Sequence, residues 1–390
     1  MREVSLSLAT PMLGGGWKAG QVDRSWPIRP SAIRGALRWW WRATTGTLID
    51  QGSLWEREAD LWGAATGEKE SKVIVSIKTL ANIGTPRQLD RNGIPPYAIG
   101  QLNLGGESKQ VLDRAEFTLS IEGHLLLTEA QAHEVGLALD CLVLFGGLGA
   151  RTTRGFGTLE VKSANGPHFS ATAKTLQETE PRCFSETFRS AYGLRIVLSR
   201  KSWKSASDAW GASLAAFANF RKAERNDGGA RKSPNRWPEA DALRGALETS
   251  GGRIVHKNGP NSLPRAEFGL PLTFRSLKGH HGFFGDATIS AYGGEDNLRL
   301  MSPVICKAIR DGATWRGGAI LLRRERLKPD QLIFKEPRLR RSMFNTDATG
   351  FPDKLMGSSG NQESFHQPHP DPLDAFAHYL TSHAGWTEVL

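Results

Sequence analysis

The segment Gly147–Gly157 combines residue types that can hold a sugar-phosphate chain. Its glycines follow the pattern G-h-G, five residues, G-h-G, where h is apolar, and two arginines and two threonines lie between the glycine pairs. Glycines let a backbone approach a ligand closely, arginines supply charge and threonines supply hydroxyl groups. The residues predicted to contact such a chain here are Gly147, Gly149, Arg151, Thr152, Thr153, Arg154, Gly155, Phe156 and Gly157.

The position of this loop disfavours a nucleotide cofactor. A Rossmann or P-loop glycine run follows a strand and opens a helix, whereas this segment follows a predicted helix and precedes a predicted strand. The simplest alternative is a hairpin-like turn with incidental arginines, although such a turn needs only one or two glycines. A substitution of Gly155 distinguishes the two interpretations. If the backbone approaches a sugar-phosphate chain, Gly155→Val reduces binding, and if the loop is only a turn, the change lowers stability alone.

A second basic surface is predicted on a helix that runs from Ser31, the expected N-cap, to about Thr45. Its apolar positions share one face and are expected to be core: Ile33, Leu37, Trp40 and Trp41. Beside them three arginines spaced four residues apart form a stripe without acids, whereas a merely solvated stripe usually mixes acids in at this spacing. Backbone N–H groups at the helix start, with the cations upstream, would add a phosphate site. The residues predicted to bind a sugar-phosphate chain here are Lys18, Arg29, Ser31, Arg34, Arg38, Trp39 and Arg42.

Groups for catalysis are poorly placed. Metal-independent RNA cleavage needs a general acid and base, usually histidine, and only His280 and His281 form a pair in a basic loop. His124 and His133 fall in predicted elements of the first half, where a structural role is expected. Carboxylates for a metal nuclease are not clustered, and the three cysteines are too isolated for a disulfide framework or a zinc site. We therefore predict no catalytic residue, no metal and no cofactor.

Composition favours a nucleic-acid partner over a membrane. The 390 residues carry 50 Lys and Arg against 40 Asp and Glu, a formal net charge of +10, and 33 of the 50 cations are arginine. Arginine binds phosphate bidentately and stacks on bases, although a basic surface kept for solubility is the alternative. No apolar run approaches the roughly 18 residues that span a bilayer. The beginning of the sequence lacks the apolar core of a signal peptide, which predicts a cytoplasmic location.

The elements expected to position these residues follow the order β-α-β-β-α-β in residues 1–162. Strands are predicted at 2–9, 72–80, 115–122 and 158–162 from period-two alternation. Helices are predicted from Ser31 and from Thr128, which caps a helix to about Phe145. Residues 81–113 form an inserted loop or extended hairpin. This order is the split unit of the ferredoxin-like fold.

The second half is predicted to be α+β, with an order that its pattern does not fix. A linker is expected at 163–190, a second domain at 191–330, and a tail with a terminal helix at 331–390. The predicted strands are 194–198, 267–274, 284–290, 303–309 and 318–324, and the predicted helices are 207–222, 238–247 and 372–383. Residues 223–236 are charged and glycine-rich, and 342–370 are rich in Ser, Gly, Asn and Pro.

These features together resemble a known family. A ferredoxin-like unit with G-h-G-x5-G-h-G between its last helix and last strand resembles the RAMP superfamily of CRISPR-associated RNA-binding proteins. The phrase Arg29–Arg42, preceded by Thr10-Pro11 and Gly14-Gly15, resembles the first subunits of the Cmr (type III-B) effector complex. Three later phrases resemble second-domain motifs of those subunits: Asn235–Arg244, Phe268–Leu272 and Arg299–Pro303. The second half departs from the family in lacking a clear G-h-G loop.

The resemblance implies a fold and a role. The expected fold is α+β, with two ferredoxin-like (RRM-like) domains that each carry insertions. The expected role is that of a non-catalytic guide-RNA (crRNA) binding subunit in antiviral defence, near the crRNA 3′ end and the target RNA. Its expected partners are crRNA, target single-stranded RNA and other Cmr-type RAMP subunits, with no membrane. The alternative is a metal-independent endoribonuclease of the same superfamily that processes precursor crRNA.

Overall fold

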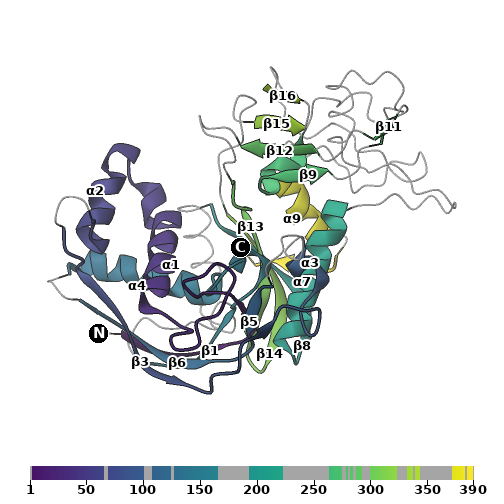
Figure 1. The fold of residues 1–390 in the computed structure, drawn as a ribbon. Coiled ribbons are helices and arrows are strands. Elements are labelled where there is room, and N and C mark those ends of the chain that lie inside the picture. The colour runs from purple at the N-terminus through teal and green to yellow at the C-terminus, as the bar shows by residue number, and fades with distance from the viewer. Residues whose placement is uncertain are drawn as a thin grey trace. The chain divides into compact units, whose positions relative to one another are not determined.

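The computed structural model shows a mixed α/β chain with several antiparallel sheets (Figure 1). The chain divides into two compact units. Unit 1 comprises Met1–Ala215, Ile305–Ile320 and Thr387–Leu390, and unit 2 comprises Ala216–Val304 and Leu321–Trp386. The structure describes residues 2–65, 69–100, 108–123, 127–165, 193–222, 263–274, 278–279, 282–283, 287–291, 299–322, 332–336, 339–342, 371–382 and 384–389.

Several predictions concern residues outside these ranges. They are the linker beyond residue 165, the stretch 223–236, the helix 238–247, the motif Asn235–Arg244, the tail segment 343–370, His124, Cys183, His280 and His281. These predictions stay predictions.

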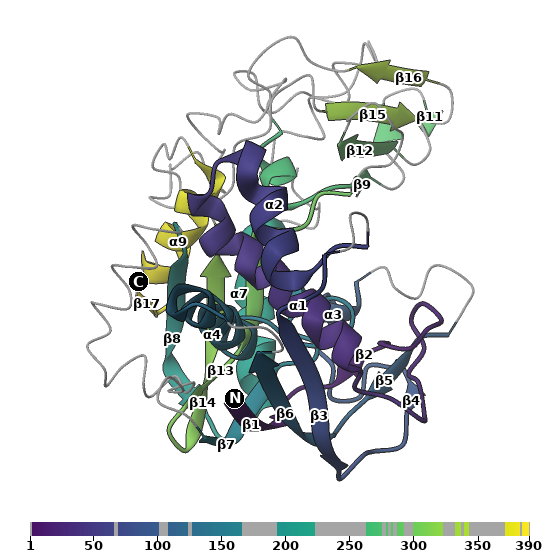
Figure 2. The ribbon, with the colours of Figure 1, turned by 90° about the vertical axis from the view of Figure 1, so that its left-hand side faces the viewer.

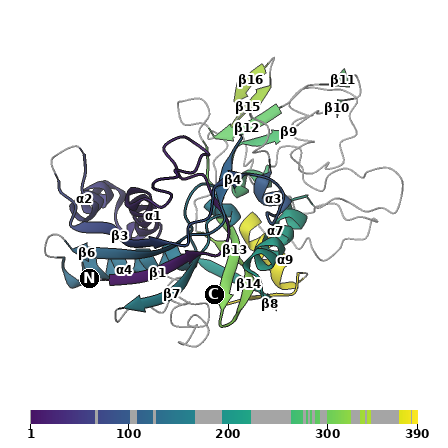
Figure 3. The ribbon, with the colours of Figure 1, turned by 60° about the horizontal axis from the view of Figure 1, so that its bottom comes forward.

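The first sheet contains the four strands predicted in residues 1–162. They are β1 (Arg2–Leu8), β3 (Val73–Ala81), β6 (Glu116–Gly123) and β7 (Leu159–Asn165), all antiparallel in the order β3-β6-β1-β7. The alternating residues of β1 are buried as predicted, with Val4 and Leu6 each 1% exposed. Helices α1 (Pro30–Ala43) and α4 (Glu129–Leu144) lie side by side on one face of this sheet (Figures 1 and 3). The predicted amphipathic faces therefore form the core of this sheet.

The ends of the two helices agree with the predictions to different degrees. Thr128 caps α4 in a capping box, since its hydroxyl accepts from Gln131 N and the Gln131 side chain accepts from Thr128 N. The prediction that Ser31 is the N-cap of α1 is wrong. The helix begins at Pro30 with Arg29 as its N-cap, because proline at the first position has a helical φ and lacks the N–H that would go unused there.

A further helix and a small sheet extend this part of the chain. Helix α2 (Gln51–Trp62), which the sequence interpretation missed, follows the 3-10 turn η1 (Thr45–Leu48). Strands β2 (Met12–Leu13), β4 (Arg87–Gln88) and β5 (Gln110–Leu112) form a three-stranded sheet in the order β2-β5-β4, which lies at the lower right of Figure 2. The segment 81–113, predicted to be an inserted loop or extended hairpin, thus contains the short strands β4 and β5 and the one-turn helix α3 (Pro96–Ile99).

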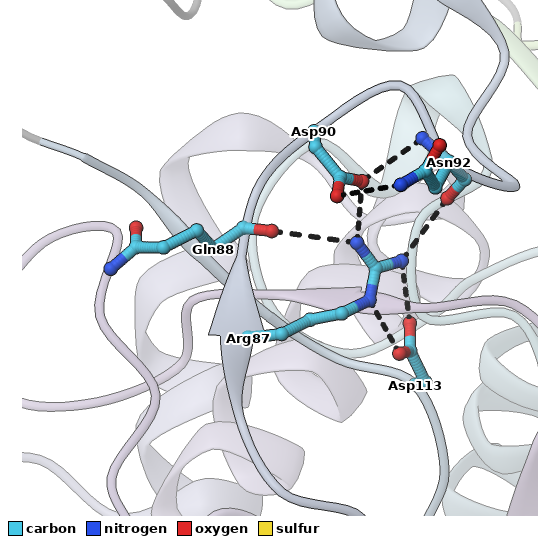
Figure 4. A network of polar contacts seen from close by, with 5 residues as sticks. All are labelled: Arg87, Gln88, Asp90, Asn92 and Asp113. Atoms are coloured by element: carbon cyan, nitrogen blue, oxygen red, sulfur yellow. Dashed lines mark hydrogen bonds and ion pairs between the residues drawn. The ribbon is translucent and has the colours of Figure 1, made fainter.

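Arg87 of β4 joins the turn that follows this strand to the residue that follows β5 (Figure 4). Its guanidinium donates to both carboxylate oxygens of Asp113, at 2.6 and 3.0 Å, and to Asp90 Oδ1 at 2.6 Å. The hydrogen bond to Asp113 raises the pKa of Arg87 above its ordinary value. The Asn92 backbone N–H and then Arg87 hold the pKa of Asp90 below its ordinary value. The turn before α3 is therefore fastened to the end of β5.

The remaining strands form two further four-stranded sheets. One has the order β13-β14-β8-β17, and the other has the order β16-β15-β12-β9. Their bounds are β8 (Arg195–Trp203), β9 (Leu272–Phe274), β12 (Ala287–Ala291), β13 (Val304–Asp311), β14 (Thr314–Leu321), β15 (Leu332–Glu336), β16 (Leu339–Ser342) and β17 (Trp386–Glu388). A separate hairpin pairs β10 (Lys278–Gly279) with β11 (Gly282–Phe283).

The predicted helices 207–222 and 372–383 are observed as α7 (Ala206–Lys222) and α9 (Pro372–Ser382). The predicted strand 267–274 is wrong in its first part, because Pro264–Phe268 form the 3-10 helix η4. The strand predicted at 318–324 begins earlier, at Thr314. Strands β15, β16 and β17 were missed. In unit 2, four phenylalanine rings pack edge to face or tilted: Phe217, Phe220, Phe268 and Phe376.

Candidate nucleic-acid interface

The outer glycines of the glycine-rich segment pack against the segment's own backbone. Leu148 N donates to Gly157 O at 3.0 Å, and a Cβ added to Gly147 would lie 2.7 Å from Phe156 O. A Cβ added to Gly157, where φ is +63°, would overlap Leu148 O. The backbones of the two G-h-G pairs therefore pack directly against each other at the base of the loop, which leaves no room for side chains at these glycines.

The second glycine pair continues into the core. Gly155 O accepts from Thr10 Oγ1 at 2.6 Å, and Phe156 is 0% exposed with its ring 5.1 Å from that of Trp210. A Cβ on Gly155, where φ is +78°, would overlap Trp210 Nε1 and lie 2.5 Å from Cys306 O. The close approach that glycine permits at this position is thus an approach to other parts of the same chain.

The middle of the loop is the part that faces solvent. Gly149 and Ala150 are exposed, and Arg151 to Arg154 are half-buried. Arg151 has a left-handed backbone, with φ of 58°, and its Nη1 donates to Ala98 O and Ile99 O at the end of α3, each at 3.1 Å. The Arg154 guanidinium lies 5.2 Å from the centre of the Tyr97 ring. Helix α3, which sequence reasoning did not connect with this loop, therefore orients both arginines.

Strand β2 links the glycine-rich loop to the segment before α1. Ala150 N donates to Leu13 O at 2.8 Å, and a Cβ on Gly149 would lie 2.6 Å from that same oxygen. The chain then enters the loop Gly14–Arg29, in which Lys18 is exposed and Arg29 Nη2 donates to Gly16 O at 3.2 Å. The predicted residues Lys18 and Arg29 thus lie on the loop that directly follows β2, and Leu13 of β2 binds the glycine-rich loop.

The arginine stripe on α1 has acidic and carbonyl partners on α2. Arg38 and Arg42 share the buried carboxylate of Glu58, with N–O distances of 2.7 and 2.6 Å. Arg34 donates to Trp62 O at the C-terminal end of α2, and burial, followed by repulsion from Arg38, lowers its pKa. The acid that sequence reasoning sought within α1 lies on a neighbouring helix, and so the stripe clamps α1 to α2.

Two arginines of the stripe still present charge to solvent. The Arg38 side chain is 37% exposed and that of Arg42 is 56% exposed. Both lie towards the end of α1, and at 1.5 Å per residue Arg42 is about 20 Å along the helix from Arg29. Ser31 is exposed at the helix start, and Trp39 is half-buried with its ring 4.8 Å from that of Trp40. The predicted residues therefore form two groups, one around β2 and one at the end of α1.

Lys307 is a residue of this region that sequence reasoning missed. It lies on β13, is 1% exposed, and its Nζ donates to Gly146 O at 2.8 Å and to Val143 O at 3.4 Å. Burial lowers the pKa of Lys307 to about 7. Its ammonium caps the carbonyl end of α4 where the glycine-rich loop begins. A lysine within the apolar run Val304–Ile309 was the available clue.

The described part of the chain offers no cluster of three or more metal-ligating side chains. Cys141 and Cys306 are both buried. Among the described helices, none has the length and hydropathy needed to cross a bilayer.

Three comparisons relate the chain to known proteins. Residues 5–160 match the RAMP superfamily. The curated protein "CRISPR system Cmr subunit Cmr1-1" of Pyrococcus furiosus is 27% identical over 155 residues, which cover 37% of this chain and 44% of that protein. The match thus spans less than half of that relative. The crystal structure of Cmr1 from Pyrococcus furiosus (apo form) is similar with a TM-score of 0.51 and 16% identity, over 100% of this chain and 98% of that chain. At this identity the similarity shows a shared fold.

Proposed function

With a RAMP superfamily match over residues 5–160 as the premise, we propose that the chain is a non-catalytic crRNA-binding subunit of a type III-B CRISPR complex. In this role it acts in the cytoplasm, near the crRNA 3′ end and the target RNA, with other Cmr-type RAMP subunits as neighbours. The observation that carries the proposal is the solvent-facing middle of the glycine-rich loop, in which α3 orients Arg151 and Arg154. Two ordered guanidinium groups beside exposed backbone suit a sugar-phosphate chain.

The proposal includes two ferredoxin-like domains, and the strand orders support it. In the first sheet, the second, third, first and fourth strands along the chain are neighbours in the order β3-β6-β1-β7. The sheet β13-β14-β8-β17 has the same order when its strands are numbered along the chain. Helix α7 follows β8 as α1 follows β1, and α9 precedes β17 as α4 precedes β7. On this proposal the second domain extends to β17, inside the segment that the sequence interpretation gave to a tail.

The RNA-contacting residues in this proposal are those with accessible groups. Around β2 they are Lys18, Arg29, Ser31, Gly149, Arg151, Thr152, Thr153 and Arg154, and at the end of α1 they are Arg38, Trp39 and Arg42. The other members of the predicted set have a supporting role. The buried Gly147, Gly155, Phe156 and Gly157 shape the loop, and the half-buried Arg34 joins α1 to α2.

Arg42→Ala is expected to weaken binding of single-stranded RNA about equally for unrelated sequences. Phosphate contacts carry no base information, and each one lost reduces the salt slope of log Kd by about 0.7 on single strands. Arg38→Ala is expected to act in the same direction. The measurement is fluorescence anisotropy of labelled RNA at several salt concentrations.

Arg57 provides the matched control for Arg42. It lies on α2, is 53% exposed and pairs with Glu134 at 3.1 Å, as Arg42 is 56% exposed and pairs with Glu58. Arg57→Ala should leave affinity and slope unchanged. Equal, unaltered slopes in the Arg38, Arg42 and Arg57 variants would make the stripe a purely structural clamp.

The purified protein is expected to leave CRISPR-repeat RNA uncleaved, with or without divalent metal, because the described residues of its predicted interface include no acid–base pair placed for the reaction. The measurement is a gel of end-labelled repeat RNA after long incubation. Defined products that vanish in a His280→Ala/His281→Ala variant would replace the binding function with that of the processing endoribonuclease.

A further inference from the structure

Two tryptophans in the loop Gly14–Arg29 stand out by their exposure. Trp17 is 85% exposed and Trp26 is 61% exposed, whereas Trp41, Trp62 and Trp210 are fully buried. A tryptophan side chain that remains in water forgoes a large burial energy. Two within ten residues of one loop therefore call for a ligand that covers them.

The loop that carries them is fastened along its length. Gly16 N donates to Gln21 O at 2.8 Å, and Gln110 N of β5 donates to Gly20 O at 2.8 Å. Asp23 Oδ1 accepts from Trp26 N at 3.1 Å. A Cβ on Gly16 would lie 3.0 Å from Asp23 N, so the chain before Trp17 lies against the chain before Trp26. The two rings thus project from one preformed platform, which lowers the entropy lost on binding.

The charges around this platform are mainly positive. Lys18 and Arg24 are exposed, Arg29 closes the loop, and the Lys109 side chain lies over Gly20. The acid in the loop, Asp23, uses its Oδ1 to accept the backbone N–H groups of Ser25 and Trp26. Exposed aromatic rings interleaved with cations are the arrangement that binds single-stranded nucleic acid, in which bases stack and phosphates meet cations.

We propose that Trp17 and Trp26 form a base-stacking site for single-stranded RNA. This inference rests on the RNA binding proposed above and adds the groups recognised: the faces of unpaired bases, of any sequence. Strand β2 connects the platform to the glycine-rich loop. On this proposal one strand of RNA lays its bases on the tryptophans and its phosphates on Arg151 and Arg154.

The test measures the affinity of the full chain for fluorescein-labelled oligouridine and oligoadenosine. Trp17→Ala and Trp26→Ala are each expected to weaken binding roughly 5-fold to 150-fold, the range found for a lost base–aromatic stack. The salt slope should not change, because stacking releases no counterions. Trp17→Phe and Trp26→Phe should restore most of the affinity, and the double Phe variant should lose the quenching of tryptophan emission that RNA causes.

Trp55→Ala is the matched control, since Trp55 is 55% exposed but lies on α2. It should bind RNA as the unaltered protein does. An unaltered protein that binds RNA together with a Trp17→Ala/Trp26→Ala variant of equal affinity would overturn the stacking site and leave the proposed function intact. An unaltered protein that fails to bind RNA would overturn the proposed function, and the stacking site with it.

Discussion

Gly157→Ala is expected to lower the melting temperature by about 10 °C or more. The added Cβ would overlap Leu148 O, and neither atom can rotate away, because the oxygen belongs to the backbone and the Cβ position is fixed by it. The residue also has φ of +63°, a conformation that costs a side-chain-bearing residue about 1 kcal/mol or more. Together, strain and overlap amount to several kcal/mol, and each kcal/mol lowers the melting temperature of a domain of this size by about 2–4 °C.

Gly35→Ala is the control for this change. Gly35 lies on the exposed face of α1, and a Cβ there would meet nothing within 4 Å. Alanine favours a helix over glycine by about 1 kcal/mol, and so this variant should be slightly more stable. A Gly157→Ala protein with the same melting temperature as the unaltered protein would contradict the close backbone packing between the two glycine pairs.

Gly155→Val, measured in the same experiment, distinguishes a loop whose backbone contacts RNA from a loop that only shapes the fold. Its Cβ would overlap Trp210, so the structure favours a loss of stability, with normal RNA affinity in the protein that remains folded. Melting temperature and RNA affinity measured on the same preparation decide this. A stable Gly155→Val protein with weakened affinity would mean that RNA approaches the backbone at this residue.

Lys307→Met is expected to alter how stability depends on pH. The folded chain holds the pKa of Lys307 at about 7, whereas an unfolded lysine titrates near 10.4. Between these values the unfolded state binds more protons, so this lysine makes the protein more stable as pH rises from about 7 to about 10.4. Below pH 7 both states are protonated and the cost of burying the ammonium is constant. Methionine removes this dependence.

The measurement is the free energy of unfolding of both proteins in urea between pH 6 and pH 10. As pH rises across this window, the free energy of unfolding of the unaltered protein should increase relative to that of the Lys307→Met variant by up to about 1.4 kcal/mol per pH unit. Lys204→Met, at an exposed position, should follow the unaltered protein at every pH. Parallel curves for the unaltered protein and Lys307→Met would mean that the ammonium is stabilised by another group.

The four strands of the first sheet and the helices α1 and α4 were predictable because their signals are local. Thr128 and Gln131 form a capping box three residues apart, and the apolar residues of β1, namely Val4, Leu6 and Leu8, alternate and are buried. Helix α2 was missed although Asp50 and Gly63 mark its two ends, because its apolar residues form no clear stripe. Without this helix the sequence could not reveal that Glu58 pairs with Arg38 and Arg42. That contact is set by the packing of two helices.

The location of the candidate site was predictable, but which of its residues pack against the chain itself and which face solvent was not. Glycine spacing indicates a backbone that something approaches closely, yet it does not say whether the neighbour is RNA or the chain itself. At Gly155 and Gly157 the neighbour is the chain. Phe156 carries no mark in the sequence that separates a buried ring from one that stacks on a base. The exposure of Trp17 and Trp26 likewise depends on how the loop is fastened.

The order of strands in the sheet β13-β14-β8-β17 has a consequence for synthesis on the ribosome. Both neighbours of β8, namely β14 and β17, lie more than 100 residues further along the chain. Arg195 of β8 pairs with Glu388 at 2.7 Å, and Val389 N donates to Ile196 O at 2.9 Å. The first sheet can form once residue 165 has emerged, whereas β8 stays without its neighbours until β17 has been made. Translation therefore includes an interval in which both edges of β8 are open to wrong pairing, and this is the interval in which a chaperone would be needed.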